Sequence, residues 1–473
     1  MVFSSGVFLL LFLPLTLLIY YNPIIKNRTF KNICLFAASL FFYAWGEPKF
    51  VFVMLFSIVV NWGLTLLLDK WRGSYAGKFI FAVLMVLDIG VLFIYKYLNF
   101  TVENLNRIPF IEICVQDILL PIGISFYTFQ IMSYVVDVYR GSTVRHAASS
   151  FLDVALYIAM FPQMIAGPIV RYSTICREIT NRSENWQDFT SGIRRFVYGL
   201  GKKVILADLL ASIADEVFLM VDITGGLTVL SAWLGAIAYM LQIYFDFSGY
   251  SDMAIGLGKC FGFHFKENFN YPYSARSISE FWKKWHISLT DWFREYVYIP
   301  LGGSRCSIGR NVLNLFIVWL LTGIWHGADW TFILWGLIYF CLQLFEKRLL
   351  KNKTLGIFGH VYTLFCVMIC WIIFRSESVS QAFSYIRVII GIKAELYDSA
   401  ALRMLQGSWI LFVTAIASCI PWKNVLMKNM VSSGSMLKIV GSVIKQTAVI
   451  VIFITALLMV INGNYSPFVY FNF

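Results

Sequence analysis

Long apolar stretches, separated by short polar loops, follow one another along nearly the whole chain. Five of them approach the roughly 20 residues that a helix needs to cross the hydrocarbon core of a bilayer: residues 2–21, 51–68, 79–98, 227–247 and 443–461. Residues 321–340 form a further stretch of this length. The pattern predicts an all-α, polytopic membrane protein, and the scarcity of long polar gaps predicts a single domain over residues 1–473.

The composition supports a membrane location. Only 14% of the 473 residues are charged and 59% are hydrophobic, whereas a soluble domain is about a quarter charged. The nine cysteines lie mostly inside apolar stretches and lack zinc-ligand spacing, so neither a metal site nor disulfides are expected. The first stretch has no basic residue before it and no small-residue cleavage site after it, which favours a retained span over a signal peptide.

The formal net charge of +12 is concentrated in some of the loops. Because cytoplasmic loops retain Lys and Arg, three basic loops in the first half are expected inside the cell and the N-terminus outside. Basic loops attract the anionic lipids of the inner leaflet. A nucleic-acid partner is not expected, because no soluble basic module is present. The cations of these loops are Lys26, Arg28 and Lys31; Lys70, Arg72 and Lys78; and Arg140 and Arg145.

Two segments are neither clear spans nor ordinary loops. Residues 171–203 are polar and basic, and their apolar residues recur at helical spacing, which predicts an amphipathic helix lying in the membrane interface. Residues 259–311 are too apolar for a solvated loop and too polar to cross. This segment is expected to dip into the membrane or lie along its cytoplasmic face, shielded by protein.

His326 lies in the stretch LTGIWHGADWTFILWGLIYF at 321–340. Ionisable residues within spans are rare and usually face a bundle interior or an aqueous cavity, so a functional role is the first hypothesis. Gly323 and Gly327 leave room for close backbone approach, and Trp325 offers a rigid wall that excludes water. A desolvated, neutral imidazole could act as a general base. The alternative is a histidine that merely hydrogen-bonds two helices together.

His286 lies in SEFWKKWHISLTDWFREY at 279–296. As one helix, this segment has an apolar stripe that includes Trp285, with charged residues on the opposite side. His286 is expected at the edge of the stripe. It is either a second functional histidine or a boundary residue of an interfacial helix anchored by tryptophans.

Three polar residues and two arginines complete the candidate site. Asp246, Tyr250 and Asp252 lie in YFDFSGYSDMAIGLG at 244–258. A spacing of six does not place the two carboxylates on one helix face, so a hydrogen-bonding wall is favoured over a catalytic carboxylate pair. Arg305 and Arg310 follow a diglycine, whose free backbone N–H groups could hold a phosphate together with guanidinium. A simple turn beside interfacial arginines is the alternative.

Together these stretches resemble the membrane-bound O-acyltransferase family, and within it the bacterial branch that O-acetylates alginate and other polysaccharides. A branch that transfers D-alanyl groups to teichoic acid shares the general pattern. One departure is Lys284 before His286, where the family usually has an arginine, since lysine lacks the bidentate fork. The motifs are FPQMIAGPIVRY at 161–172, YFDFSGYSDMAIGLG at 244–258, NFNYPYSARSISEFWKKWHISLTDWFREYVYIPLGGSR at 268–305, LTGIWHGADWTFILWG at 321–336 and the closing SPFVYFNF.

The resemblance implies about eleven transmembrane helices in a ring around a central tunnel, with interfacial and re-entrant helices. It implies His326 as the catalytic residue and His286 as a second functional residue nearby. The implied reaction takes an acetyl or other short acyl group from cytoplasmic acetyl-CoA, with no tightly bound cofactor. Arg305 and Arg310 are candidates to meet the coenzyme A phosphates.

The resemblance also implies partners and a location. The acyl group would pass across a bacterial inner or plasma membrane to an extracytoplasmic, serine-hydrolase-like acetyltransferase, which modifies a polysaccharide acceptor. Two other classes of protein stay open. A transporter could use buried His and Asp residues as proton relays, but it would not consume acetyl-CoA. A non-catalytic scaffold would tolerate the loss of His326.

Overall fold

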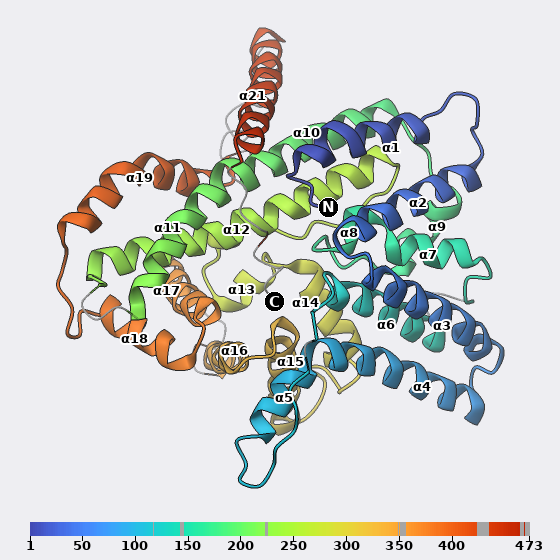
Figure 1. The fold of residues 1–473 in the computed structure, drawn as a ribbon, viewed down its shortest axis with the longest axis horizontal. Coiled ribbons are helices and arrows are strands. Elements are labelled where there is room, and N and C mark those ends of the chain that lie inside the picture. Colours follow the sequence, from blue (N-terminus) through green and yellow to red (C-terminus); the bar gives the residue numbers. More distant parts are fainter. Residues whose placement is uncertain are drawn as a thin grey trace. The chain divides into compact units, whose positions relative to one another are not determined.

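The computed structural model describes residues 1–116, 118–141, 146–222, 226–348, 350, 356–422, 435–463 and 468. These residues form helices, turns and loops and no β-strand, in agreement with the predicted all-helical class (Figure 1). The chain divides into two compact units. The first comprises Met1–Phe196 and Met253–Lys266, and the second Val197–Asp252 and Glu267–Phe473. The expectation of one domain over the whole chain stays a prediction.

Seven helical segments in the described part of the chain are long and apolar enough to cross a membrane. They confirm the expected spans at 51–68, 79–98, 227–247 and 443–461. The first apolar stretch forms a shorter helix, Phe8–Tyr20. The protein is therefore a multi-pass membrane protein, while the ring of about eleven helices stays a prediction. The seven are Phe50–Lys70, Tyr75–Leu105, Val229–Cys260, Ile308–His326, Gly356–Arg375, Ser399–Ser418 and Val443–Ile461.

The first unit packs its helices around rings of phenylalanine. Phe161 contacts the rings of Phe8, Phe12 and Phe42, with centroids 5.4 to 6.3 Å apart. The elements are η1 (Phe8–Phe12), α1 (Leu13–Tyr20), α2 (Arg28–Gly46), α3 (Phe50–Lys70), α4 (Tyr75–Leu92), η2 (Phe93–Tyr97), α5 (Leu98–Leu105), α6 (Ile124–Arg140), α7 (Phe151–Ala159), α8 (Phe161–Met164), α9 (Tyr172–Thr180) and most of α10 (Trp186–Gly201). Helix α10 confirms a helix in the amphipathic segment at 171–203; its place in the interface stays a prediction.

A buried ion cluster joins distant segments of the first unit. The Arg182 side chain is buried, donates from Nε to Tyr20 Oη at 3.0 Å, and stacks on Phe263 at 4.4 Å. Tyr20 Oη in turn donates to Glu184 Oε1 at 2.6 Å. Arg28 and Lys31 approach the same carboxylate at 2.5 and 3.1 Å. Charges taken out of water persist because each one is paired and hydrogen-bonded.

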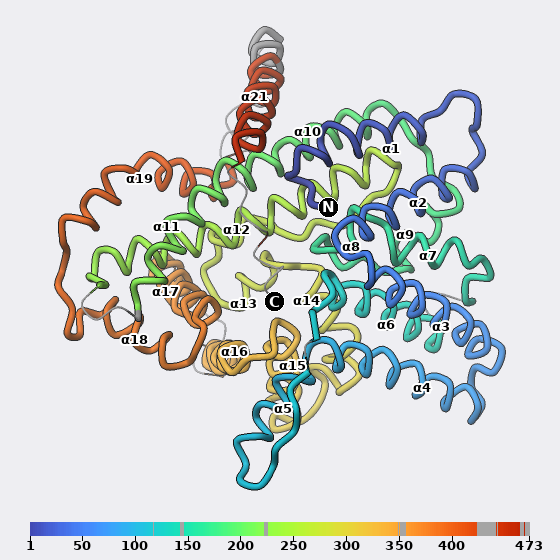
Figure 2. Tube along the Cα trace, viewed as in Figure 1, coloured from blue at the N-terminus to red at the C-terminus, as the bar shows by residue number. Residues whose placement is uncertain are grey.

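The second unit contains the histidines of interest. Helix α12 runs through it without a break before entering the first unit (Figure 2). The elements are η3 (Lys202–Ala207), α11 (Asp208–Leu219), η4 (Met220–Asp222), α12 (Val229–Cys260), η5 (Pro272–Ser274), α13 (Ile278–Trp282), α14 (Ile287–Phe293), η6 (Arg294–Tyr298), α15 (Ile308–His326), α16 (Trp330–Arg348), α17 (Gly356–Arg375), α18 (Val379–Ile389), α19 (Ser399–Ser418) and α21 (Ser435–Ile461).

The stretch 321–340 is not one span, as its apolarity suggested, but the corner of a helical hairpin. Helix α15 ends at His326, and α16 starts at Trp330 and runs back along it. The hairpin closes through glycine: a Cβ on Gly323 would lie 2.5 Å from Phe332 O, and one on Gly336 would lie 2.5 Å from Trp319 O. The expected close backbone approach is confirmed at Gly323.

The segment 259–311 lacks a membrane-length helix among its residues, as expected, but its central helix is broken. The single helix predicted over 279–296 is wrong. Helix α13 ends at Trp282, and α14 starts after His286, whose backbone is left-handed at φ 44°. The break follows from tertiary hydrogen bonds: Ile287 N donates to Asn268 O, and Asn270 N donates to Lys284 O, both at 2.9 Å.

The ion cluster predicts how stability depends on pH. Partial burial alone would raise the pKa of Glu184, but hydrogen bonds from Arg28, Tyr20 and Lys31 hold that pKa at about 2, below its ordinary value of 4.5. Because the unfolded chain then binds more protons at acid pH, this contribution to stability is present above pH 4.5 and is lost as the pH falls toward 2. Glu184→Gln should lower thermal stability at pH 7 and flatten its acid dependence. Exposed Glu112→Gln is the control, and equal melting curves for both variants would contradict the prediction.

The hairpin predicts opposite signs for two Gly→Ala changes. Gly336→Ala should destabilise the protein by about 1–3 kcal/mol, because its Cβ meets a backbone oxygen that cannot move aside. Gly309→Ala, in the first turn of α15 with nothing within 4 Å of its Cβ, should be neutral or stabilising by up to about 1 kcal/mol. Thermal unfolding of both variants in detergent measures the contrast; a Gly336→Ala protein as stable as the wild type would rule out the close packing.

Candidate functional site

His326 lies at the C-terminal end of α15, enclosed by aromatic rings. Its side chain is 3% exposed. The ring of Trp335 on α16 lies 4.8 Å away, that of Phe374 on α17 at 5.2 Å, and that of the adjacent Trp325 at 5.0 Å, all edge-to-face. Such an enclosure excludes water from the imidazole. Three helices therefore fix one histidine in an apolar, rigid surrounding.

His286 is fully buried at the junction of α13 and α14. It is not the edge residue of an amphipathic helix, as the sequence suggested. Phe247 of α12 contacts its ring edge-to-face at 4.6 Å, and Trp325 lies 6.0 Å away. A left-handed backbone is unfavourable for a non-glycine residue by about 1–2 kcal/mol and marks sites that the surrounding structure holds in place.

Asn268 fixes the orientation of His286. Its Nδ2 donates to Ser251 Oγ at 3.0 Å, while its Oδ1 accepts from Ser288 Oγ at 2.8 Å and lies 3.2 Å from His286 Nδ1. Because this amide oxygen can only accept, Nδ1 of His286 carries the proton and Nε2 is the basic nitrogen. Burial lowers the pKa of His286 to about 3. The imidazole is thus neutral at physiological pH.

Trp325 connects the two histidines. Its ring contacts both imidazoles, with centroids 6.0 Å from His286 and 5.0 Å from His326. Trp285, fully buried next to His286, lies 4.9 Å from Trp371, and Trp371 lies 6.2 Å from Trp335. The candidate residues Trp285 and Trp325 are therefore parts of one aromatic layer around the histidines. The structure brings the two histidines and both tryptophans together.

Asp246 is buried on α12 and engages in a three-membered ion cluster. Its Oδ1 lies 2.7 Å from Lys203 Nζ, which also approaches Asp208 Oδ1 at 2.8 Å. Burial alone would lower the pKa of Lys203, but the two carboxylates outweigh it and hold that pKa above its ordinary value. Burial raises the pKa of Asp208 to about 7 despite the neighbouring ammonium. The cluster anchors the start of α11 to the middle of α12.

Tyr250 and Asp252 have partners other than those of Asp246, although all three lie on α12. Tyr250 is buried, and its ring lies 5.0 Å from Phe468; Phe468 also contacts Phe247, the neighbour of His286. Asp252 is partly exposed and pairs with Lys202 at 2.6 Å. The two carboxylates bind different lysines, which agrees with the reading that their spacing does not form a catalytic pair.

The two arginines of the expected phosphate site are exposed and lie outside the aromatic layer. Gly302 and Gly303 form a turn with positive φ, but their N–H groups donate to Ile299 O and Tyr298 O, and Arg305 N donates to Gly302 O. The expectation of free backbone donors at these positions is therefore wrong, because the turn uses them internally. Arg310 donates from Nε to Leu301 O. A role for the guanidinium groups in donor binding stays a prediction.

A pocket of about 600 Å³ lies next to the aromatic layer. We name it the Lys283 pocket. Thr322, one turn before His326 on α15, forms part of its wall, and so does Trp282, whose ring lies 5.7 Å from Trp335. Lys283 and Arg294 supply two cations to the lining and Asp291 one carboxylate, which leaves a net positive charge. The pocket combines an apolar wall next to the histidines with positive charge.

Several residues of the site escaped the sequence analysis. Asn268 lies inside a quoted motif, but nothing in the pattern linked it to His286. Lys203 was read only as part of a basic segment. Trp335, Trp371 and Phe374 looked like ordinary apolar residues of spans. In each case the partner is distant in sequence, so only an unusual residue type in an apolar setting, such as a buried Lys or Asn, could have given a signal.

A match to the membrane-bound O-acyltransferase family model covers residues 37–378. Among individual proteins, the probable alginate O-acetylase AlgI of Azotobacter vinelandii is 44% identical over 394 residues, covering 81% of this chain and 76% of that protein. The probable alginate O-acetylase AlgI of Pseudomonas putida is 37% identical over 500 aligned positions, covering 100% of each chain. The peptidoglycan O-acetyltransferase of Helicobacter pylori is 33% identical, covering 83% and 80%.

The ion cluster of α12 predicts a large effect of one lysine. Lys203→Met should destabilise the protein by about 3–5 kcal/mol, because it leaves two carboxylates buried without their cation. Lys202→Met, at a partly exposed pair on the adjacent residue, should cost about 1 kcal/mol or less. Replacing all three charged groups together (Lys203→Met with Asp208→Asn and Asp246→Asn) should recover much of the loss. Thermal unfolding in detergent measures the series, and equal losses for the two lysine variants would contradict it.

Proposed function

The chain belongs to the membrane-bound O-acyltransferase family, and from that premise we propose that it transfers an acetyl group, or another short acyl group, from cytoplasmic acetyl-CoA toward a polysaccharide outside the membrane. It is an O-acyltransferase. The observation that supports the finer proposal is the pair of buried histidines, His286 and His326, whose rings both contact Trp325. The relatives named for alginate and peptidoglycan O-acetylation support acetyl as the group and a polysaccharide as the final acceptor.

In this proposal His326 is the general base. Its imidazole takes the proton of an acceptor hydroxyl while that oxygen attacks the thioester carbonyl. The carbon–sulfur bond then breaks, and the coenzyme A thiolate leaves with the proton that the imidazolium returns. General acid–base catalysis of this kind contributes about 10²–10⁴ to the rate. The surrounding rings Trp325, Trp335 and Phe374 support the role, since they exclude water from the imidazole and fix its orientation.

In this proposal His286 orients the acyl donor or the acceptor and does not itself transfer a proton. Asn268 accepts the hydrogen bond of its Nδ1–H, so its Nε2 can accept a hydrogen bond from either substrate, the acyl-CoA or the acceptor of the acyl group. Trp285 and Trp325 exclude water from the reaction, and Asp246, Tyr250 and Asp252 are proposed as wall or hydrogen-bonding residues of the tunnel. The burial of Asp246 and Tyr250 on α12, and the ion pairs of both carboxylates with lysines of η3, support a structural share in that wall.

The Lys283 pocket is the proposed entry of the donor. Its cations Lys283 and Arg294 match the phosphates of coenzyme A, and its inner wall includes Thr322 beside His326. Arg305 and Arg310 remain candidates for the outer phosphates. Acetyl-CoA acts as a substrate that comes and goes, without a tightly bound cofactor.

The proposal requires that the acyl group passes across a bacterial inner or plasma membrane, in which the protein has its N-terminus outside. A donor made in the cytoplasm and an acceptor outside need a site reachable from both faces, which a ring of about eleven helices around a tunnel would supply. A serine-hydrolase-like acetyltransferase outside would take the group and modify the polymer. The basic loops of the first half support this orientation.

The test is acetyl transfer in liposomes containing the purified full chain. Labelled acetyl-CoA is supplied to the basic face, with a candidate extracytoplasmic acetyltransferase on the other, and both coenzyme A release and label on the acceptor are measured. His326→Ala should lower transfer by about 10²–10⁴-fold, and His286→Ala by less. His146→Ala, at an exposed histidine of a loop, is the matched control and should transfer at the wild-type rate.

Two results would overturn the proposal. One is full transfer by a folded His326→Ala protein, which would remove the general base. The other is the absence of thioester consumption with every short acyl-CoA tried. Proton-coupled solute flux in the same liposomes would then favour the transporter class.

A further inference from the structure

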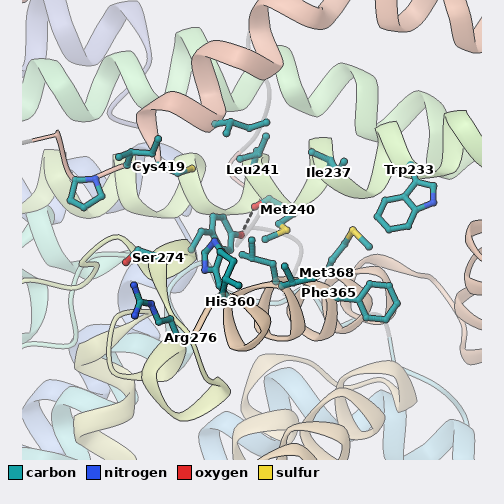
Figure 3. Close-up of a pocket in the computed structure, with 17 residues that line it drawn as sticks. Trp233, Ile237, Met240, Leu241, Ser274, Arg276, His360, Phe365, Met368 and Cys419 are labelled. Atoms are coloured by element: carbon teal, nitrogen blue, oxygen red, sulfur yellow. Dashed lines mark hydrogen bonds between the residues drawn. The ribbon is translucent and has the colours of Figure 1, made fainter. Parts of the chain in front are cut away.

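A second pocket, of about 770 Å³, lies in the second unit away from the Lys283 pocket (Figure 3). We name it the Arg276 pocket. Helix α12 contributes Trp233 and Ile237, α17 contributes Phe365 and Met368, and the end of α19 adds Cys419. None of these residues is assigned a part in acyl transfer. The pocket therefore needs an explanation of its own.

The polar groups of the Arg276 pocket gather at one end. Figure 3 shows Ser274, Arg276 and His360 together, and Trp233 and Phe365 at the opposite end. Arg276 is exposed; its backbone N–H donates to Glu280 Oε2 at 2.8 Å, while its guanidinium forms no ion pair within 4 Å in the described part of the chain. His360 Nδ1 donates to Ala275 O at 3.0 Å, so its Nε2 is the nitrogen left for a ligand. The lining is thus amphipathic, with a cationic head and a long apolar body.

Charge along the chain assigns the polar end to one side of the membrane. His360 lies in the first turn of α17, which follows Arg348, Lys351 and Lys353 in sequence. The other contributing helix end, that of α19, is followed by Lys423 and Lys428. Because cytoplasmic loops retain Lys and Arg, the polar end faces the cytoplasmic leaflet. That leaflet carries anionic lipids, which attract such cations.

The apolar body opens toward lipid rather than toward water. Ile357, Val361 and Phe365 of α17 line the pocket and are 69, 61 and 45% exposed, and Ile416 of α19 is 51% exposed. On helices long and apolar enough to span a membrane, such side chains face acyl chains. A water-soluble ligand would have to replace lipid at this surface, whereas a lipid can enter the pocket laterally from the bilayer.

We propose that the Arg276 pocket binds one anionic phospholipid of the cytoplasmic leaflet. Its phosphate lies between the Arg276 guanidinium and His360 Nε2, and its acyl chains run along α12 and α17 toward Trp233. A guanidinium donates several hydrogen bonds to phosphate oxygens, and the apolar lining matches the chains in place of water. The match of a cationic end with an apolar body selects an anionic lipid over a zwitterionic one.

The bound lipid would also contact residues that pack against the candidate active site. Tyr273 lines the pocket, and its ring lies 6.3 Å from Trp285. Met368 lines it as well, one turn before Trp371 on α17. The back of the aromatic layer around the histidines is therefore a wall of the Arg276 pocket. A lipid that binds only the folded protein raises its thermal stability by mass action.

The test uses the purified full chain, stripped of lipid in neutral detergent. Phosphatidylglycerol and phosphatidylcholine with the same acyl chains are titrated separately, and native mass spectrometry counts the bound lipid. The wild type should bind one phosphatidylglycerol in preference. Arg276→Gln should weaken that binding about fivefold, the contribution of one cation near an anionic lipid surface, and should weaken phosphatidylcholine binding by less, because the net charge of that lipid is zero. Leu364→Trp, which fills the apolar body, should weaken both.

Matched controls lie outside the pocket. Arg403→Gln and Ile410→Trp change exposed residues of α19 that do not line it, and both should bind lipid as the wild type does. The proposal is overturned if Arg276→Gln and Arg403→Gln weaken phosphatidylglycerol binding equally, or if Leu364→Trp binds it normally. Displacement of the lipid by acetyl-CoA, or by a transmembrane peptide of a partner but not by other anionic lipids, would equally assign the pocket to another occupant.

Discussion

The structure of the second unit depends on one constraint: an ionisable group in an apolar interior must be held neutral or be paired. The chain meets it in three ways. Aromatic rings from three helices surround His326, an amide holds His286 in one tautomer, and two carboxylates share Lys203. Each solution ties together segments that are far apart in sequence. The polar groups therefore specify which helices are neighbours. Uniformly apolar spans would specify their neighbours poorly, because lipid chains and helix surfaces are equally apolar.

The two histidines come together through backbone geometry as much as through side chains. Glycines let α15 and α16 lie so close that the hairpin corner falls directly after His326. On the other side, backbone hydrogen bonds with the loop around Asn268 break the helix at His286. Trp325 then fills the space between the two imidazoles. Neither histidine could hold its position if only its own helix were fixed, and the surrounding rings accordingly come from α12, α15, α16 and α17.

The sequence predicted the membrane class, four of its spans, the apolar stripe around Trp285 and the burial of His326, while the roles of both histidines stay predictions. It failed where tertiary contacts override periodicity. The helical pattern of 279–296 is genuine, yet hydrogen bonds from residues 268 and 270 interrupt it, and no local signal reports a partner so distant. Likewise the apolarity of 321–340 suited a span, because hydropathy does not register a corner made of glycine and packed rings. Lys203 and Asn268 were missed because their partners are defined only in three dimensions.

The left-handed backbone of His286 has an evolutionary consequence. A conformation that costs about 1–2 kcal/mol lowers the stability of every copy of the protein, so selection for heat resistance alone would replace this residue with glycine or asparagine, which adopt it readily. Natural proteins keep such local strain where activity outweighs robustness. Stabilised variants obtained by blind screening should therefore be sequenced first at this position, since a gain in stability there would come with the loss of the imidazole.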